Sequence, residues 1–127
     1  MENIKGIDIL VKVNDIVIGG QQGATLNRSK EGIEITSKDS NGWKDQVGGI
    51  KEWGIDADGL FVIDDAGYKA LEDSFMNDAK VEVSLATPTG AKYEGEAIVT
   101  DFPLEAGFED MATYSLTLEG CGELKIV

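Results

Sequence analysis

Residues 52–63 read EWGIDADGLFVI and carry the clearest strand pattern in the chain. Trp53, Ile55 and Ala57 fall on one parity, while acidic residues and glycine occupy the other. Successive side chains of a β-strand point to opposite faces of the sheet, so this two-residue period predicts a strand with one apolar and one acidic face. The stretch therefore predicts a sheet with one buried side and one side facing solvent.

The same period recurs on both sides of this stretch. Residues 7–13 alternate, and Asn14-Asp15 turns the chain into a short partner at residues 16–18, which predicts a hairpin. Residues 27–32 are polar, and we interpret them as a connection between two short strands. The further segments predicted as strands are 24–26, 33–36, 81–85, 93–101 and 113–119.

One segment has a helical period instead. Tyr68, Leu71 and Phe75 recur at the spacing of one helix face, with charged residues between them. The Asp-Asp pair at 64–65 precedes this segment and offers a side chain to cap the first turn. The pattern predicts one helix over about residues 65–77.

Together these segments predict a mainly β fold. Its simplest form is a two-sheet antiparallel β-sandwich or partly open barrel, with one flanking α-helix and a long polar loop. The 127 residues suit a single domain, residues 1–127, with one core. The 16 Gly and 2 Pro residues favour a turn-rich β-protein over a helical bundle.

The long loop covers residues 37–49 and is rich in Ser, Asp, Asn, Gly and Lys. Loops of this length without their own secondary structure are uncommon in compact domains and are usually functional. Trp43 is its one large aromatic side chain. Trp43 either folds back onto the core of its own domain or anchors the loop in a neighbouring subunit, and the loop composition favours the second reading.

The charge balance excludes several classes of protein. The chain has 11 Lys and Arg residues against 24 Asp and Glu residues, which gives a formal charge of −13. A chain this acidic repels a polyanion, so a conventional nucleic-acid-binding domain is not expected. The sequence contains no His, which removes Ser-His and Cys-His nucleophile pairs and imidazole metal ligands. We therefore do not expect an enzyme.

No motif in the chain predicts a cofactor or a metal site. The fragment Asp56-Ala57-Asp58-Gly59 is similar to part of a calcium loop, but a third ligand and the terminal Glu are missing. Glu94 and Glu96 lie two apart on a predicted strand, where outward acids are ordinary surface residues rather than a glycosidase pair. We expect neither catalysis nor a bound metal.

The single cysteine, Cys121, cannot form an internal disulfide. The N-terminus lacks the basic and then apolar pattern of a secretory signal, and the sequence has no long apolar run. These features predict a protein of a reducing cytoplasm with no membrane partner.

Several segments, taken in order, resemble the tail tube proteins, also called major tail proteins, of tailed bacteriophages and prophages. The resemblance extends over nearly the whole chain, in sequence order. It rests on GIDILVKVN (6–14), IGGQ (18–21), TSKDSNGWK (36–44), WGIDADGL (53–60), GYKALE (67–72) and IVTDFPLEA (98–106).

The resemblance implies a structural virion protein that self-assembles. In that family, β-sandwich subunits with a flanking helix form hexameric rings, and the rings stack into a hollow tube through which the viral genome is ejected. The implied partners are further copies of the chain, the tape measure, the distal tail and terminator proteins, and a sheath if the tail is contractile. DNA is then only a transient cargo without sequence specificity. The implied location is the phage tail, after a period in the host cytoplasm.

The resemblance also assigns roles to two sets of residues. It implies that the long loop stacks one ring on the next, and that some strand acids face the lumen, where they repel DNA and lower friction. A role in keeping free subunits soluble explains the same acids without a lumen. The loop set is Ser37, Lys38, Asp39, Ser40, Asn41, Gly42, Trp43 and Lys44, and the possible lumen acids are Asp8, Glu52, Asp56, Asp58, Glu94 and Glu96.

An alternative function belongs to a different class. A ligand- or carbohydrate-binding β-sandwich module would use Trp43 and Trp53, together with the acidic strand faces, as a platform for a saccharide. An aromatic content of 7% leaves this alternative behind the tail tube.

Overall fold

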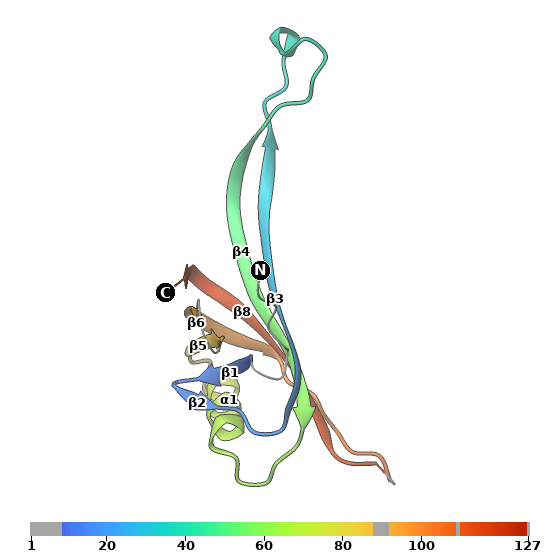
Figure 1. Ribbon diagram of the computed structural model, residues 1–127, viewed down its shortest axis with the longest axis vertical. Coiled ribbons are helices and arrows are strands. Elements are labelled where there is room, and N and C mark those ends of the chain that lie inside the picture. Colours follow the sequence, from blue (N-terminus) through green and yellow to red (C-terminus); the bar gives the residue numbers. More distant parts are fainter. Residues whose placement is uncertain (1–8, 88–91, 109, 127) are drawn as a thin grey trace.

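The structure is a computed structural model that describes residues 9–87, 92–108 and 110–126. A body of strands and one helix carries a long hairpin that rises away from it (Figure 1). The described strands are β1 (Leu10–Val13), β2 (Ile16–Val17), β3 (Gln21–Glu34), β4 (Gln46–Leu60), β5 (Val81–Ala86), β6 (Lys92–Asp101), β7 (Leu104–Glu105) and β8 (Thr113–Ile126), and the helices are the 3-10 helix η2 (Lys38–Ser40) and α1 (Ala66–Asn77).

All of these strands belong to one antiparallel sheet. Their order is β2-β1-β5-β6-β8-β4-β3, and β7 adds to β8 outside this path. The sheet twists strongly and does not close, with α1 against one side of the body (Figure 1). The predicted mainly β fold with one flanking helix is confirmed, in the form of an open, single sheet.

The apolar parity predicted from residues 52–63 forms the centre of the core. Ile55 and Ala57 of β4 pair with Leu118 and Leu116 of β8, and all four side chains are buried. The buried core also includes Val11, Val13, Ile18, Trp53, Tyr68, Leu71, Val81, Val83, Leu85, Ala97, Val99 and Tyr114. The helix covers this side of the sheet, so the opposite parity is left facing solvent.

Helix α1 begins where the sequence predicts. The Asp65 side chain accepts hydrogen bonds from the backbone N–H of Tyr68 at 2.9 Å and from that of Gly19 at 3.0 Å. One carboxylate therefore caps the helix and ties it to the end of the β1-β2 hairpin. The predicted face is only partly right, because Leu71 is buried whereas Phe75 is 47% exposed.

Tyr114 makes the stability of the body sensitive to alkaline pH. Burial, and then the negative charges of Asp65 and Asp58, raise the pKa of Tyr114 to about 12 from the ordinary 10.0. Because the folded state holds this proton more tightly than the unfolded state, the stabilisation is complete below pH 10.0 and is lost as the pH rises toward about 12.

We expect the free energy of unfolding to fall by about 1–2 kcal/mol over that interval, measured by urea denaturation at a series of pH values. In a Tyr114→Phe variant most of this decrease in the free energy of unfolding with pH should disappear. A small part should remain because burial also raises the pKa of Tyr68. An equal decrease in the variant and the wild type would contradict the assignment of the alkaline destabilisation to Tyr114.

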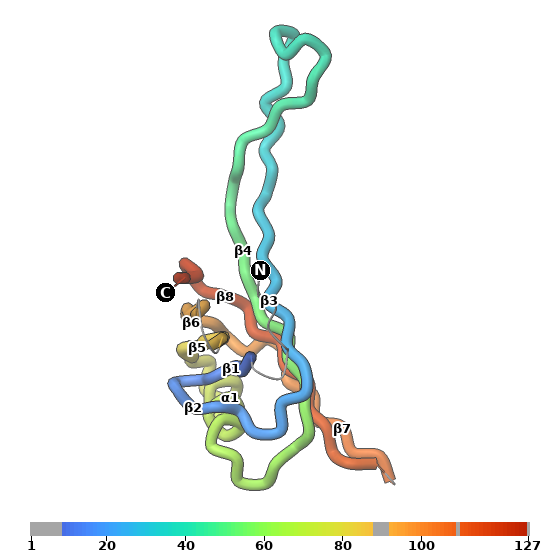
Figure 2. The backbone as a smooth tube through the Cα atoms, in the orientation of Figure 1, coloured from blue at the N-terminus to red at the C-terminus, as the bar shows by residue number. Residues whose placement is uncertain are grey.

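The hairpin corrects the prediction for residues 27–32. These residues are not a connection, because β3 runs without a break from Gln21 to Glu34. β4 begins at Gln46, so the last four residues of the predicted loop 37–49 also belong to a strand. Residues 27–32 are exposed on both sides of the hairpin and show no alternation between apolar and polar residues, the signal on which the prediction depended. We call residues 28–51 the arm (Figure 2).

Candidate assembly surfaces

The arm has two different faces. Ile33 lies directly opposite Val47, and Lys30 lies directly opposite Lys51. Between these two pairs the register shifts, and β4 contains one extra residue at Gly49–Ile50. Because of this bulge, Val47 and Ile50 lie on the same face of the arm. The two glycines mark the two faces: a Cβ atom built on Gly49 would lie 3.1 Å from Ile33 Cδ1, whereas one built on Gly48 would lie 2.9 Å from Lys30 Cδ. Ile33 and Lys30 therefore lie on opposite faces of the arm.

One face of the arm is consequently apolar, and no other described segment of the chain packs against it. Its four side chains lie in the outer part of the hairpin, away from the core cluster. We call this set the apolar face; its exposed fractions are 49% for Ile33, 48% for Ile35, 46% for Val47 and 71% for Ile50. Contiguous apolar side chains on a projecting element mark an interaction surface rather than a stable free surface.

The tip of the arm gathers the predicted loop residues Ser37 to Lys44. The Ser37 side chain and η2 form a capping box, and Asn41 and Gly42 turn the chain with φ angles of 54° and 82°. The Trp43 backbone N–H donates to the Ser40 carbonyl at 3.0 Å, while the Trp43 side chain is 79% exposed. Trp43 does not fold back onto its own core, so the intramolecular reading is wrong.

The acids predicted on strands lie on the side of the sheet opposite the core. Glu52, Asp56 and Asp58 take the exposed parity of β4, and Glu94 and Glu96 take the same side of β6. Asp8 lies outside the described residues. The register adds two acids that the sequence analysis missed: Glu82 lies opposite Glu96, and Glu119 lies opposite Ile98. We call the set Glu52, Asp56, Asp58, Glu82, Glu94, Glu96 and Glu119 the acidic face.

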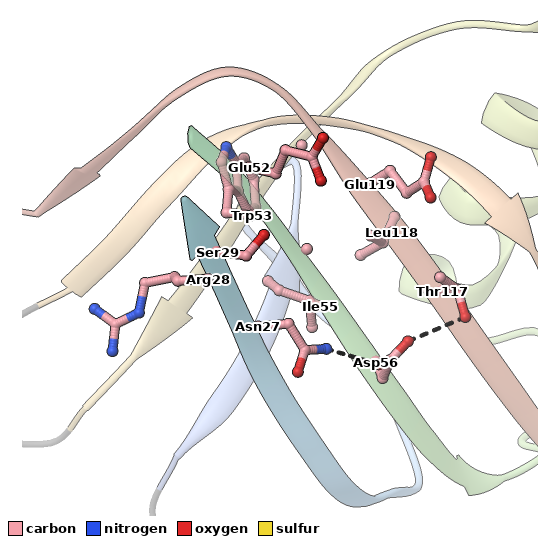
Figure 3. Close-up of a pocket in the computed structure, with 12 residues that line it drawn as sticks. Asn27, Arg28, Ser29, Glu52, Trp53, Ile55, Asp56, Thr117, Leu118 and Glu119 are labelled. Atoms are coloured by element: carbon pink, nitrogen blue, oxygen red, sulfur yellow. Dashed lines mark hydrogen bonds between the residues drawn. The ribbon is translucent and has the colours of Figure 1, made fainter. Parts of the chain in front are cut away.

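A shallow hollow of about 660 Å³ lies on this side, between β3, β4 and β8 (Figure 3). At its floor the Asp56 carboxylate accepts from Asn27 Nδ2 at 2.7 Å and from Thr117 Oγ1 at 3.1 Å (Figure 3). Elsewhere on the acidic face, Glu94 pairs with Lys92 at 3.4 Å. The hollow is open, and polar and apolar atoms line it about equally, so it lacks the enclosed and mainly apolar form of a ligand pocket.

The structure separates the two tryptophans required by the saccharide alternative. Trp53 is 9% exposed and donates its indole N–H to the Gly122 carbonyl at 3.1 Å, whereas Trp43 stands at the tip of the arm. Within the described ranges, no three acidic or cysteine side chains are grouped as metal ligands. No described helix is long and apolar enough to cross a membrane.

Several solved structures share this fold. The chain matches a protein of the native gene transfer agent (GTA) virion with a TM-score of 0.91 and 21% identity, over 98% of this chain and 99% of that one. It matches a protein of the empty GTA particle tail, which has C6 symmetry, with a TM-score of 0.89, 21% identity and coverages of 98% and 99%. The SPP1 tail tube gives a TM-score of 0.79 at 18% identity, over 96% and 78% of the two chains.

These identities establish the common fold and no more. A search among curated protein sequences finds no match. The family assignment comes instead from the sequence profile of the phage tail tube proteins, which matches residues 3–126, nearly the whole chain. The chain belongs to the phage tail tube protein family.

Proposed function

We propose that this chain forms hexameric rings that stack into the tail tube of a phage or prophage particle, the channel through which DNA is ejected. The observation that carries this proposal is the arm, which projects from the body and whose apolar face is covered by none of the residues that the structure describes. An ordered hairpin of this length outside the core needs contacts to hold it, and neighbouring copies supply them. The sixfold symmetry of the GTA tail supports the hexamer.

The arm is the proposed assembly element of a single domain, residues 1–127. Its tip, Ser37 to Lys44, extends toward an adjacent ring, where Trp43 inserts as an apolar anchor. The edge strand β3 has unpaired backbone groups along one side, and pairing with the neighbouring subunit converts this aggregation hazard into a closed ring.

The acidic face is the proposed wall of the lumen. Its position opposite the core and helix leaves it free to line a channel, and its six-fold repetition builds a strongly negative surface. Such a wall repels the phosphates of DNA, so that the genome slides without being held. Asp8 remains a candidate for the same wall from the sequence alone.

The remaining parts of the proposal follow from this role. The chain is a structural component of the virion tail and performs no catalysis. Its protein partners are its own copies first, and then the tape measure, distal tail and terminator proteins at the ends of the tube, with a sheath if the tail contracts.

The single thiol of the chain provides a test of the lumen. Cys121 lies directly opposite Glu96 in the register, on the acidic face. We expect negative-stain electron microscopy to show hollow tubes in which Cys121 reacts with a small maleimide but is strongly protected from a bulky polyethylene-glycol maleimide. In dispersed subunits both reagents should react.

A matched variant carries the thiol on the other side of the sheet, with Cys121→Ser and Glu72→Cys on α1. Its tubes should react with both reagents, because this helix position then faces outward. Labelling of wild-type tubes by the bulky reagent at the rate of dispersed subunits would place the acidic face outside and contradict the proposed lumen.

A further inference from the structure

A second projection lies at the end of the body opposite the arm. We call residues 103–112, of which the structure describes all but residue 109, the spur. β7 joins the described part to β8, and this part extends downward in Figure 2 while the arm extends upward. Leu104 is 50% exposed, Met111 73%, and Phe108 is fully exposed. The spur sequence, PLEAGFEDMA, contains three acidic residues and no basic residue.

A groove of about 410 Å³ lies at the base of the arm. Trp53, Leu124 and Ile126 give it apolar walls, and Ile126 is 66% exposed. The cations Arg28, Lys30 and Lys51 also line the groove, together with the acids Glu52 and Glu123. The groove therefore combines apolar surface with three positive charges, which is unusual in a chain of formal charge −13.

Within the part of the chain that the structure describes, neither Lys30 nor Lys51 forms an ion pair, although Glu52 and Glu123 line the same groove. Lys30 and Lys51 lie directly opposite each other, and like charges in that arrangement are destabilising. The ion pairs found in the described part of the chain are Lys69–Asp64 and Lys92–Glu94, neither of them in the arm. The Arg28 Cζ atom lies over the Tyr93 ring, 5.5 Å from its centroid, and this contact brings no carboxylate to the guanidinium charge.

The distribution of charge along the chain separates the arm from everything else. The arm holds five of the 11 basic residues and four of the 24 acidic residues, so its formal charge is +1, while the rest of the chain carries −14. An acidic, apolar segment of the same chain is thus the natural complement of the groove.

We propose that the spur of a second copy occupies this groove, with Phe108 against Trp53, Leu124 and Ile126, and with Glu105 and Asp110 facing Lys30 and Lys51. The groove lies at the base of the arm and the spur lies at the opposite end of the body (Figure 2), so the contact joins copies head to tail, from one ring to the next. The inference rests on the proposed tube and names the surface that receives each subunit in the adjacent ring.

Reversal of charge on each side separately, and then on both sides together, tests the contact. Glu105→Lys with Asp110→Lys should raise the critical concentration for self-association about tenfold at low salt, measured by light scattering. Lys30→Glu with Lys51→Glu should do the same. The chain carrying all four substitutions should recover to within about twofold of the wild type, because the pairs are restored with opposite sign.

Two matched pairs of reversals control for net charge. Glu72→Lys with Asp73→Lys, both exposed on α1, changes the charge as the spur variant does. Lys69→Glu with Lys80→Glu matches the arm variant. Neither pair should shift the critical concentration by more than about twofold, since exposed charges away from a contact contribute little. Thermal unfolding should show that every variant keeps its fold.

The outcomes separate the contact from the tube. Two results contradict the spur contact alone: a spur variant with the critical concentration of the wild type, or a chain with all four substitutions whose critical concentration is as high as that of the two separate variants. Wild-type chains that remain monomeric at every concentration contradict the proposed tube as well.

Discussion

Val47→Glu is expected to abolish tube formation at concentrations where the wild type assembles, while leaving a monomer that unfolds at nearly the wild-type temperature. Val47 is 46% exposed and lies in the arm, outside the core cluster, so the body loses no packing. Substitutions at such positions usually change stability by less than about 0.5 kcal/mol. Assembly responds differently, because the apolar face is buried only when subunits join.

The expected effect on assembly is large for two reasons. Full burial of an exposed valine side chain contributes about 1.5–3 kcal/mol; because Val47 is already half-buried in the free arm, about half of this, ~1 kcal/mol, is lost in every subunit. The new carboxylate must in addition leave water in an apolar contact, which costs further free energy unless it finds a partner. A rise in critical concentration of about 100-fold follows from these two contributions, since each factor of ten corresponds to about 1.4 kcal/mol.

Gln46→Glu is the matched control. It introduces the same charge at the adjacent residue, on the other face of the arm and opposite Glu34. Repulsion from Glu34 also reproduces any fraying of the hairpin caused by an added acid. Light scattering and sedimentation velocity should show near-normal assembly of this variant. Equal behaviour of the two variants would mean that charge, and not the apolar face, controls assembly.

The sequence was most informative where one side of an element is buried. The alternation at Trp53, Ile55 and Ala57 predicted their strand, and the spacing of Tyr68 and Leu71 predicted the helix, because burial imposes a period on the residues. The arm has no such constraint on its strands. Residues 27–32, which include Lys30 opposite Lys51, are exposed on both sides, so no periodic signal there distinguished a strand from a loop.

The acidic face was predictable strand by strand but not as a surface. Asp56 and Asp58 were found from local parity, whereas the register brings Glu82 of β5 and Glu119 of β8 to the same face. Register depends on contacts between residues far apart in the chain, which a single sequence does not reveal. The composition of residues 37–49 favoured a Trp43 that does not fold back onto its own core, but it did not reveal the long hairpin that carries this side chain away from the body.

Gly120→Val is expected to lower the free energy of unfolding by about 3–5 kcal/mol, within the range for severe core disruption. A Cβ atom at Gly120 would overlap the indole of Trp53. Gly95 supports the other end of the same ring, where a Cβ atom would lie 2.6 Å from Trp53 Cζ2. The ring lies against the backbone at both glycines, so a side chain at Gly120 displaces it from this position, and the ring loses its burial and its hydrogen bond to Gly122.

Fluorescence reports this displacement directly in a Trp43→Phe background, where Trp53 is the remaining tryptophan. The emission maximum should move to longer wavelength as the indole meets water, together with a fall in the urea midpoint. Gly48→Val serves as the control, because its added Cβ meets only the flexible side chain of Lys30. A β-branched residue at that exposed strand position should change stability by less than about 0.5 kcal/mol.

The position of Trp53 extends the consequence from stability to assembly. Trp53 pairs with Arg28 on the rung where the arm leaves the body, and its indole joins β4 to the far end of β8. Displacement of the ring leaves the residues of the arm unchanged, but it removes the contact that fixes the direction of the arm relative to the body. Gly120→Val should therefore fail to form tubes even at temperatures where the body remains folded. Normal tubes from a variant with exposed Trp53 would show that the arm is oriented by its neighbours and not by its own subunit.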